Sequence, residues 1–181
     1  MKVTLMRHEK SACPKPSFFL DSGSFRGWAE AYDAAGIVKP ISRSGGHAYS
    51  SCYSSDLIRA VETAAVAYEG DIVTTPLLRE IPLSPFTETG LKLPHPLWNA
   101  IGRFAWTLSH LSQPESKRDS SIRADEFVSH LLQNHSAREH VLVVTHGFFL
   151  LPLSASLLKA GFTGRRTARL RNGECLTYDK A

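Results

Sequence analysis

Seven residues near the start of the chain, 5–11, combine side chains that could do chemistry. The stretch LMRHEKS places Arg7, His8, Glu9 and Lys10 directly after a short apolar run. A buried strand usually ends in turn residues such as glycine, asparagine or aspartate. An arginine and a histidine at that position are costly to desolvate unless an anion neutralises them. The stretch therefore indicates a site that binds an anionic group.

A second apolar run also ends in a histidine. VTLMRH ends at His8, and VLVVTH ends at His146. In open α/β sheets, ligands collect outside the carboxyl ends of the strands. If the two strands are neighbours, both imidazoles face the same crevice. The alternative for His146 is a satisfied core histidine at the end of a buried strand.

A guanidinium from a third part of the chain is expected at the same place. Arg59 lies in the first turn or so of a helix that follows CYSS, 52–55. Side chains on a helix lean toward its N-terminus, and free backbone N–H groups lie there. Arg59 alone could equally pair with Glu62 on a helix surface. Together with Arg7 and the two histidines, however, it predicts a pocket for a tetrahedral dianion, with phosphate as the expected guest.

A phosphate pocket that contains an imidazole favours nucleophilic catalysis. Nearby arginines would lower the pKa of His8, because a like charge disfavours the imidazolium. A neutral imidazole nitrogen can then attack phosphorus and form a phosphohistidine, while the arginines stabilise charge on the equatorial oxygens. Expelling an alkoxide requires a proton. Glu80 in LLREIP is the expected acid, with Glu88 in reserve.

The elements that must position these residues alternate along the chain. Strands are expected at 2–6, 71–76, 139–147 and 174–179, and helices at 25–37, from CYSS to Gly70, at 97–110, at 122–135 and from 148 to Gly161. Ser54, Ser55 and Asp56 are candidate caps of the second helix. Residues 12–24, 39–51 and 81–96 are expected to be loops, and the basic run 164–174 a solvated strand. Such alternation predicts an α/β layer structure around a mostly parallel sheet.

Composition narrows the class of protein. The 181 residues, 20.0 kDa, fit a single domain, 1–181, and 43% hydrophobic residues provide a core. The net charge of +4 does not choose between nucleic acid, a membrane surface and acidic substrates. No apolar run approaches the ~20 residues that span a bilayer, and three scattered cysteines argue against disulfides. We expect a cytoplasmic protein.

Four motifs in order resemble the histidine phosphatase superfamily, the phosphoglycerate-mutase-like enzymes. RHEKS matches the family pattern R-H-G-[ED]-[ST] except at Glu9, where the family has glycine. SSDLIRAVETA, 54–64, matches the second motif almost letter for letter. LRE, 78–80, and VLVVTHGFF, 141–149, match the third and fourth. The resemblance implies a three-layer α/β fold with a mostly parallel central sheet.

The resemblance also implies roles for individual residues. His8 would be the nucleophile and Glu80 the proton donor, while Arg7, Arg59 and His146 would bind phosphate. Ser11 would either line the pocket or only begin the loop. We expect the Glu9 carboxylate to point away from the phosphate, which it would otherwise repel. Residues 12–50 do not follow the pattern of the mutases.

The predicted function is hydrolysis of phosphomonoesters, or of a phospho-amino-acid, without metal or other cofactor. The partner would be a phosphorylated small molecule or phosphoprotein, with neither nucleic acid nor membrane expected. One alternative is a phosphoglycerate-type mutase. Another is a non-catalytic phosphate-binding module in which Glu9 has spoiled the site. His130, His135 and His140 are five residues apart and share no helix face, which argues against a metal site.

Overall fold

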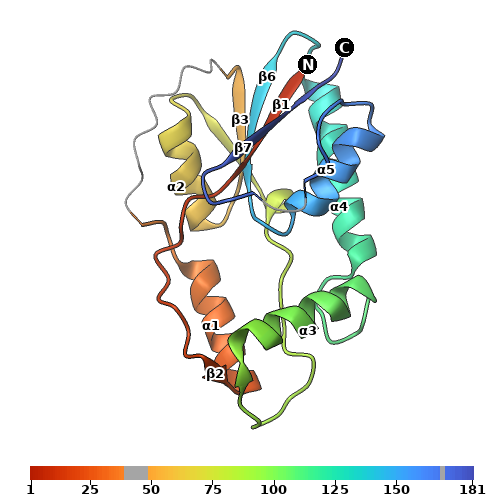
Figure 1. The fold of residues 1–181 in the computed structure, drawn as a ribbon. Coiled ribbons are helices and arrows are strands. Elements are labelled where there is room, and N and C mark those ends of the chain that lie inside the picture. The colour runs from red at the N-terminus through yellow and green to blue at the C-terminus, as the bar shows by residue number, and fades with distance from the viewer. Residues whose placement is uncertain (39–48, 168–169) are drawn as a thin grey trace.

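Five strands form the central sheet of the structure, a computed structural model that describes residues 1–38, 49–167 and 170–181 (Figure 1). They are β1 (Lys2–Arg7), β3 (Ser51–Ser55), β4 (Ile72–Thr75), β6 (His140–Thr145) and β7 (Cys175–Asp179). Their order is β4-β3-β6-β1-β7. β4, β3, β6 and β1 are parallel, and β7 is antiparallel to β1. The sheet is therefore mostly parallel, as predicted.

The two strands that end in histidines are neighbours in this sheet. β1 pairs with β6 in parallel register, and Arg7 stands opposite Thr145 at the end of the ladder. His8 and His146 each follow immediately, so both leave the sheet at its carboxyl edge. This is the edge at which open α/β sheets bind ligands.

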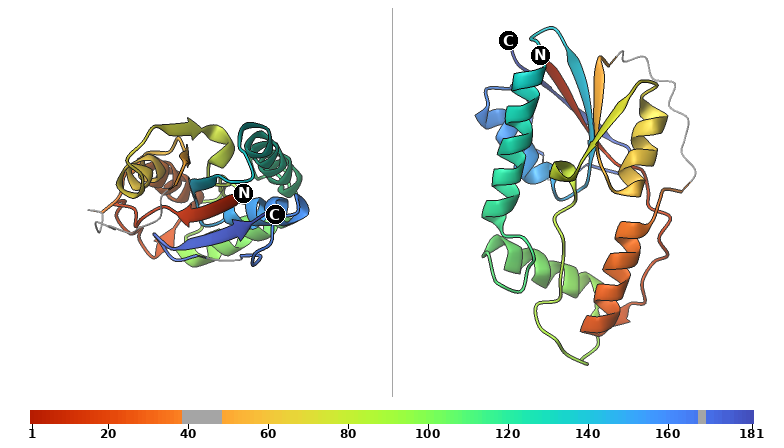
Figure 2. Two further views of the ribbon diagram at one scale, coloured as in Figure 1. Left: turned by 90° about the horizontal axis from the view of Figure 1, so that it is seen from above. Right: turned by 180° about the vertical axis from the view of Figure 1, so that it is seen from behind.

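Helices cover both faces of the sheet and extend beyond its carboxyl edge. The helices are α1 (Ser22–Ala34), α2 (Ile58–Ala67), α3 (His95–Thr107), α4 (Lys117–Asn134), α5 (Leu150–Lys159) and the short 3-10 helix η1 (Pro76–Leu78). α2 lies on one face, and α4 and α5 on the other, which gives three layers (Figures 1 and 2). α1 and α3 lie past the carboxyl edge, far from both termini (Figure 1). β2 (Phe19–Leu20) and β5 (Leu93–Pro94) pair beside them.

Alternating residues of the strands supply the two main cores. Val3, Leu5, Val141 and Val143 pack toward α4 and α5, while Met6, Leu142 and Val144 pack toward α2. A strand of a parallel sheet covered on both faces is apolar at every position, which explains the unbroken runs in the sequence. The two cores fix the positions of the strand ends.

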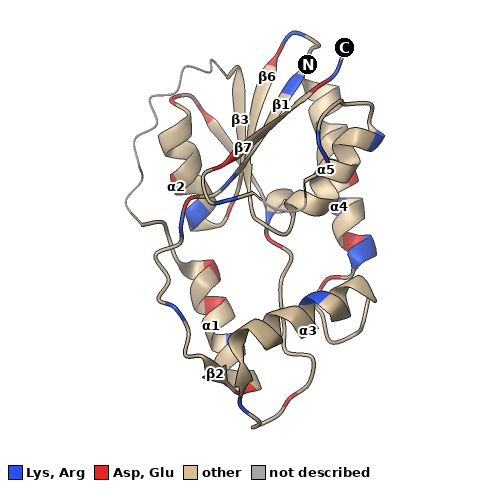
Figure 3. Ribbon diagram, in the orientation of Figure 1, with Lys and Arg blue, Asp and Glu red and all other residues tan. Residues whose placement is uncertain are grey.

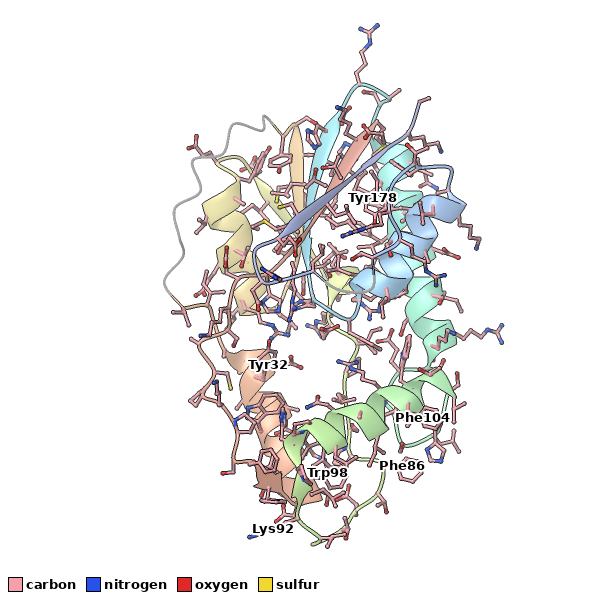
Figure 4. All side chains as sticks on the ribbon, in the orientation of Figure 1. Tyr32, Phe86, Lys92, Trp98, Phe104 and Tyr178 are labelled. Carbon is pink, nitrogen blue, oxygen red and sulfur yellow. The ribbon has the colours of Figure 1, made fainter. Side chains whose placement is uncertain are left out.

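A third, smaller core holds α1 against α3. It consists of Leu20, Phe25 and Trp98, and the indole of Trp98 lies between the two helices (Figure 4). The indole Nε1 donates a 2.7 Å hydrogen bond to the Leu20 carbonyl. This helix pair has its own packing, and it faces the carboxyl edge of the sheet (Figure 1).

Two helices begin earlier than the sequence predicted. α1 starts at Ser22, where the Asp21 side chain accepts a hydrogen bond from the Ser24 N–H and caps the helix. α4 starts at Lys117 rather than at 122, behind a capping box formed by Ser116 and Asp119. Both starts have the side-chain caps that stabilise free N–H groups. In the described part of the chain, no helix is long and apolar enough to cross a bilayer.

The predicted caps of α2 were wrong. Its N-cap is Leu57, which has no side-chain hydrogen bond to the helix. Ser54 and Ser55 are instead the last two residues of β3. Asp56 forms an ion pair with Arg79, with two hydrogen bonds of 2.7 and 2.6 Å.

The basic run was also wrongly predicted as a strand. Its described residues lie in turns and irregular backbone before β7, and Arg169 lies outside the described residues, as do 39–48 of the expected loop. Thr167 and Leu170 are buried, so the run packs against the molecule instead of forming an exposed ribbon.

Candidate active site

The imidazoles of His8 and His146 face one another at the carboxyl edge of the sheet. Their ring centroids are 5.0 Å apart, with an angle of 54° between the rings. They are 1% and 0% exposed. At this separation both rings can contact the oxygens of a single phosphoryl group. The structure thus brings together the two histidines that the sequence placed on separate strands.

A hydrogen bond fixes the tautomer of His8. Its Nδ1 lies 2.6 Å from the carbonyl oxygen of Glu9. A carbonyl only accepts hydrogen bonds, so Nδ1 carries the proton and donates it. In the neutral ring, Nε2 then holds the free lone pair. The free lone pair of the His8 imidazole is therefore on Nε2.

Both histidines are held in the neutral form. Burial first, and then the charges of Arg59 and Arg7, lower the pKa of His8 to about 3, against the opposing hydrogen bond to Glu9. Burial also holds the pKa of His146 well below its usual value, followed by the charges of His8 and the arginines. The sequence predicted the effect of the arginines, but burial is the larger cause.

Arg7 is fixed by the last turn before β7. Its Nη1 donates a 2.7 Å hydrogen bond to the carbonyl of Leu170. A Cβ atom at Gly147 would lie 2.9 Å from the Cζ of Arg7, so a larger residue there would displace this guanidinium. The glycine of the T-H-G sequence thus makes room for Arg7.

Arg59 is fully buried, which rules out a pair with Glu62 on the helix surface. Its Nη1 donates hydrogen bonds to the carbonyls of Tyr32 and Asp33, and its Nη2 to the Asp33 carboxylate. Tyr32 lies at the end of α1 nearest the sheet (Figure 4), with its ring 4.7 Å from the Arg59 Cζ. Glu62 instead accepts a hydrogen bond from the Ile37 N–H.

Three buried nitrogens of this cluster have no hydrogen-bond partner among the described residues. They are Nε of Arg7, Nε of Arg59 and Nδ1 of His146. The Nε2 of His146 lies 2.8 Å from the Ser55 hydroxyl. Buried polar groups are normally hydrogen-bonded, and leaving one unpaired costs about 1–3 kcal/mol. Two of these unpaired nitrogens belong to guanidinium groups, so their N–H donors remain available to an anionic ligand.

The carboxylate of Glu80 contacts the backbone just before α5, at two residues that closely follow His146 in the chain. Its Oε1 accepts hydrogen bonds from the N–H groups of Ile81 and Phe149, and its Oε2 from that of Phe148. The segment that carries it is held by Arg123, which donates hydrogen bonds to the carbonyls of residues 77 and 79. The position of Glu80 is therefore set by three backbone donors.

The other two candidate residues lie outside this cluster. Glu88 forms an ion pair with Arg26 and accepts a hydrogen bond from Ser22, at the far end of α1. The hydroxyl of Ser11 accepts a 3.1 Å hydrogen bond from the Cys13 N–H within the loop. Glu80 is thus held against the residues that follow His146, whereas Glu88 is not.

The carboxylate of Glu9 is turned toward Gly173. A Cβ atom at Gly173 would overlap that carboxylate, and the φ angle of +70° also favours glycine there. The Glu9 backbone N–H donates a 2.9 Å hydrogen bond to the Thr63 hydroxyl, and the Glu9 carbonyl accepts the hydrogen bond from Nδ1 of His8. Asn172 donates a 2.9 Å hydrogen bond to the His8 carbonyl. The backbone of this segment is therefore tied to both α2 and the turn before β7.

Four residues of the site were missed from the sequence. Thr63 and Asn172 hold the His8 segment, Asp33 pairs with Arg59, and Arg103 of α3 donates a 3.0 Å hydrogen bond to the carbonyl that follows Glu80. Thr63 lies inside the second motif and could have been found there. The other three are distant in the chain and have no local signal.

A cavity of about 280 Å³ opens between the sheet edge and the helix pair. It is lined by the side of α1 that carries Trp28 and Asp33, by Arg7 and Glu80, and by Asn99 and Arg103 from α3, among others. Figure 3 shows acidic residues on the ribbon of α1 and a basic residue on that of α3. Arg7, the residue before His8, thus lines this cavity together with Glu80.

The described residues hold no group of three or more histidine, cysteine or acidic side chains that could bind a metal ion.

Comparisons with solved structures support the fold. The chain is similar to a mycobacterial glucosyl-3-phosphoglycerate phosphatase, with 20% identity and a TM-score of 0.67 over 97% of this chain and 88% of that one. It is also similar to a phosphoserine phosphatase from Entamoeba histolytica, with 17% identity and a TM-score of 0.63 over 97% and 89%. No sequence among the curated proteins matches it.

A family model matches residues 34–179, which include three of the four motifs. The first motif precedes this range, but β1 places it in the same sheet, beside the strand of the fourth. The ordered motifs, the sheet and the family match agree: the chain belongs to the histidine phosphatase superfamily (branch 1).

Proposed function

We propose that this protein hydrolyses phosphomonoesters through a phosphohistidine on Nε2 of His8. The observation that carries the proposal is the hydrogen bond from Nδ1 of His8 to the Glu9 carbonyl, which leaves Nε2 as the free nucleophilic nitrogen. The family, and the two phosphatases similar in fold, agree with this chemistry.

In the first step, Nε2 of His8 attacks phosphorus and a new N–P bond forms. The P–O bond to the leaving group breaks, and its oxygen takes a proton from the Glu80 carboxyl. An oxygen that accepts one hydrogen bond keeps a second lone pair, so Oε2 of Glu80 can carry this proton beside the Phe148 N–H. Arg7 and Arg59 stabilise the charge on the equatorial oxygens.

In the second step, water attacks the phosphohistidine and the N–P bond breaks. Glu80, now ionised, accepts the proton of that water, which restores the acid for the next cycle. His8 returns to the neutral form with its proton still on Nδ1. The low pKa of both histidines keeps the nucleophile unprotonated in the free protein at neutral pH.

The side chain of Glu9 supports catalysis over the alternative of a spoiled binding module. Its carboxylate is directed at Gly173, so the departure from the family glycine adds no repulsion between His8 and a phosphate. The backbone groups of Glu9 also serve the site, through Thr63 and His8.

The test is chemical trapping. The protein is incubated with a phosphorus-labelled aryl phosphate, quenched in alkali and assayed for acid-labile label, with turnover measured in parallel. We expect label and turnover in the wild type, neither in His8→Ala, and both in His110→Ala, an exposed histidine outside the site. Turnover that survives in His8→Ala would refute the proposal.

The same experiment separates the alternatives. A phosphate-binding module would bind inorganic phosphate but give neither label nor turnover across a panel of phosphomonoesters. A mutase would isomerise phosphoglycerate after priming instead of releasing phosphate.

A further inference from the structure

Arg103 is a cation in the cavity without an anionic partner. Among the described residues, no carboxylate lies within ion-pair distance of its guanidinium. By contrast, Arg26, Arg79 and Arg123 each pair with an acid. Burial lowers the pKa of Arg103, with Glu80 and Asp33 acting only at longer range in the opposite direction. A charge removed from water in this way is costly unless a ligand compensates it.

The guanidinium of Arg103 is held in place but keeps donors free. Its Nη1 donates to the Ile81 carbonyl, and its Cζ lies 3.9 Å from the ring centroid of Phe148. These two contacts fix its plane and one of its edges. Nε and Nη2, which share the other edge of a guanidinium, form no hydrogen bond within the described chain. Two parallel N–H groups on one edge match the two oxygens of a carboxylate.

The face of α3 that carries Arg103 is polar where it meets the cavity. His95, Asn99 and Arg103 follow one another at intervals of four residues, so they lie on one side of the helix, and all three line the cavity. A solvated helix face would explain such a stripe on an open surface. Arg103, however, is partly buried and has unused N–H donors. A ligand-binding face explains both observations.

The same cavity contains the residues assigned to the reaction. Arg7 and Glu80 line it together with Arg103, and Arg103 contacts the residue next to Glu80. A molecule whose phosphate reaches Arg7 therefore has its remaining part in front of Arg103. The volume of 280 Å³ corresponds to roughly nine water molecules at ~30 Å³ each. That space fits a small metabolite rather than a folded phosphoprotein.

We propose that Arg103 binds a carboxylate of the substrate, so that the preferred substrates are small phosphomonoesters that also carry a carboxylate. The inference rests on the proposed function, because the phosphate of the same molecule occupies the histidine site. Asn99, one turn away, supplies a polar side chain to the same group.

The test compares two substrates that differ in one group. 3-Phosphoglycerate carries a carboxylate where glycerol 3-phosphate carries a neutral CH2OH. We expect the wild type to prefer 3-phosphoglycerate by roughly 10- to 100-fold in kcat/KM, the range of a hydrogen-bonded charge. Arg103→Met keeps apolar bulk over Phe148 and should bring the ratio near one, with the loss confined to 3-phosphoglycerate. Arg118→Met, an exposed arginine of α4, should keep the wild-type ratio.

A purely positioning role for Arg103 predicts a different result. Its hydrogen bond to Ile81 lies beside Glu80, so loss of positioning would lower kcat/KM for both substrates by the same factor and leave their ratio unchanged. That outcome, or a wild type with no preference, would overturn the proposal. Arg103→Lys separates charge from geometry, because it keeps the cation without the paired donors, and we expect an intermediate ratio.

Equilibrium binding tests the carboxylate site apart from turnover. Calorimetry on the wild type should give tighter binding of 3-phosphoglycerate than of glycerol 3-phosphate. The measurement is made at low temperature before turnover accumulates, or with an inactive preparation. Arg103→Met should abolish this difference and leave the affinity for inorganic phosphate unchanged. If turnover is absent but the difference in binding exists, the proposed function fails and the carboxylate site stands. Equal binding of both molecules to the wild type would overturn the carboxylate site itself.

Discussion

The guanidinium of Arg59 donates a 3.0 Å hydrogen bond to the carboxylate of Asp33, which ties the end of α1 to the phosphate site. Asp33 is 48% exposed, whereas Arg59 is fully buried. The carboxylate therefore uses one donor of a guanidinium that, in the proposed mechanism, binds the phosphate. An incoming phosphate can bind Arg59 through its unpaired Nε and the second N–H of Nη2, or it can replace Asp33.

Removing the charge of Asp33 should strengthen phosphate binding. Asp33→Asn keeps the shape of the side chain but weakens its competition for Arg59. Because half-exposed ion pairs contribute up to about 1 kcal/mol, we expect the inhibition constant for inorganic phosphate to fall about twofold to fivefold. Inhibition kinetics measure it, with Glu30→Gln, an exposed acid of the same helix, as the control. Unchanged or weaker inhibition in Asp33→Asn would show that Asp33 does not compete.

Glu80→Gln should slow hydrolysis more strongly when the leaving group is more basic. An alkoxide requires a proton as it departs, whereas p-nitrophenolate does not. We expect the rate of the labelling step, measured in single turnover, to fall by roughly 10²- to 10⁴-fold with an alkyl phosphate and much less with p-nitrophenyl phosphate. Glu88→Gln, beside Arg26, should leave both unchanged. Equal losses on both substrates would count against proton donation by Glu80.

Restoring the family glycine at position 9 should change activity little. The carboxylate of Glu9 faces Gly173, and the backbone groups that serve the site remain in Glu9→Gly. We therefore expect kcat/KM within about threefold of the wild type, the scale of a small backbone effect. A rise of tenfold or more would mean that the carboxylate repels the substrate phosphate.

The low pKa of His8 makes folding stability depend on pH. The unfolded chain binds a proton on this histidine near pH 6.5, whereas the folded protein does so only near pH 3. Stability from this group is therefore complete above pH 6.5 and is lost as the pH falls toward 3. The titration of His8 should lower the free energy of unfolding by about 1.4 kcal/mol between pH 7.5 and pH 5.5.

Urea unfolding at these two pH values measures the effect. His146, whose pKa is also lowered, should add a loss of the same sign. His8→Gln should reduce the difference in unfolding free energy between the two pH values, since groups elsewhere cancel in the comparison with the wild type. An identical pH dependence in the variant would contradict a neutral, buried His8.

The sequence predicted the candidate site residues best where they follow the ends of apolar runs. β1 and β6 are buried on both faces, so polar residues mark where each strand leaves the core, and His8 and His146 stand out for that reason. Arg59 and Glu80 were found through the spacing of their motifs. In the structure, hydrogen bonds to backbone groups hold both side chains in place.

The helix starts had a local signal that was overlooked. Ser116 and Asp119 form a capping box with the spacing S-x-x-D, which marks the start of α4. By contrast, the pairing of Asp33 with Arg59, and the position of Arg103 in the cavity, depend on how α1 and α3 pack through Phe25 and Trp98. No pattern within either helix encodes that packing.

The most direct measurement is the chemical position of a phosphoryl group trapped on the wild-type protein. Alkaline quenching during turnover of an aryl phosphate, followed by peptide mapping and isomer-specific detection of phosphohistidine, locates the modified nitrogen. Because Nδ1 of His8 donates to the Glu9 carbonyl, we predict label on Nε2 of His8. Label on Nδ1, or on His146 instead of His8, would contradict this mechanism.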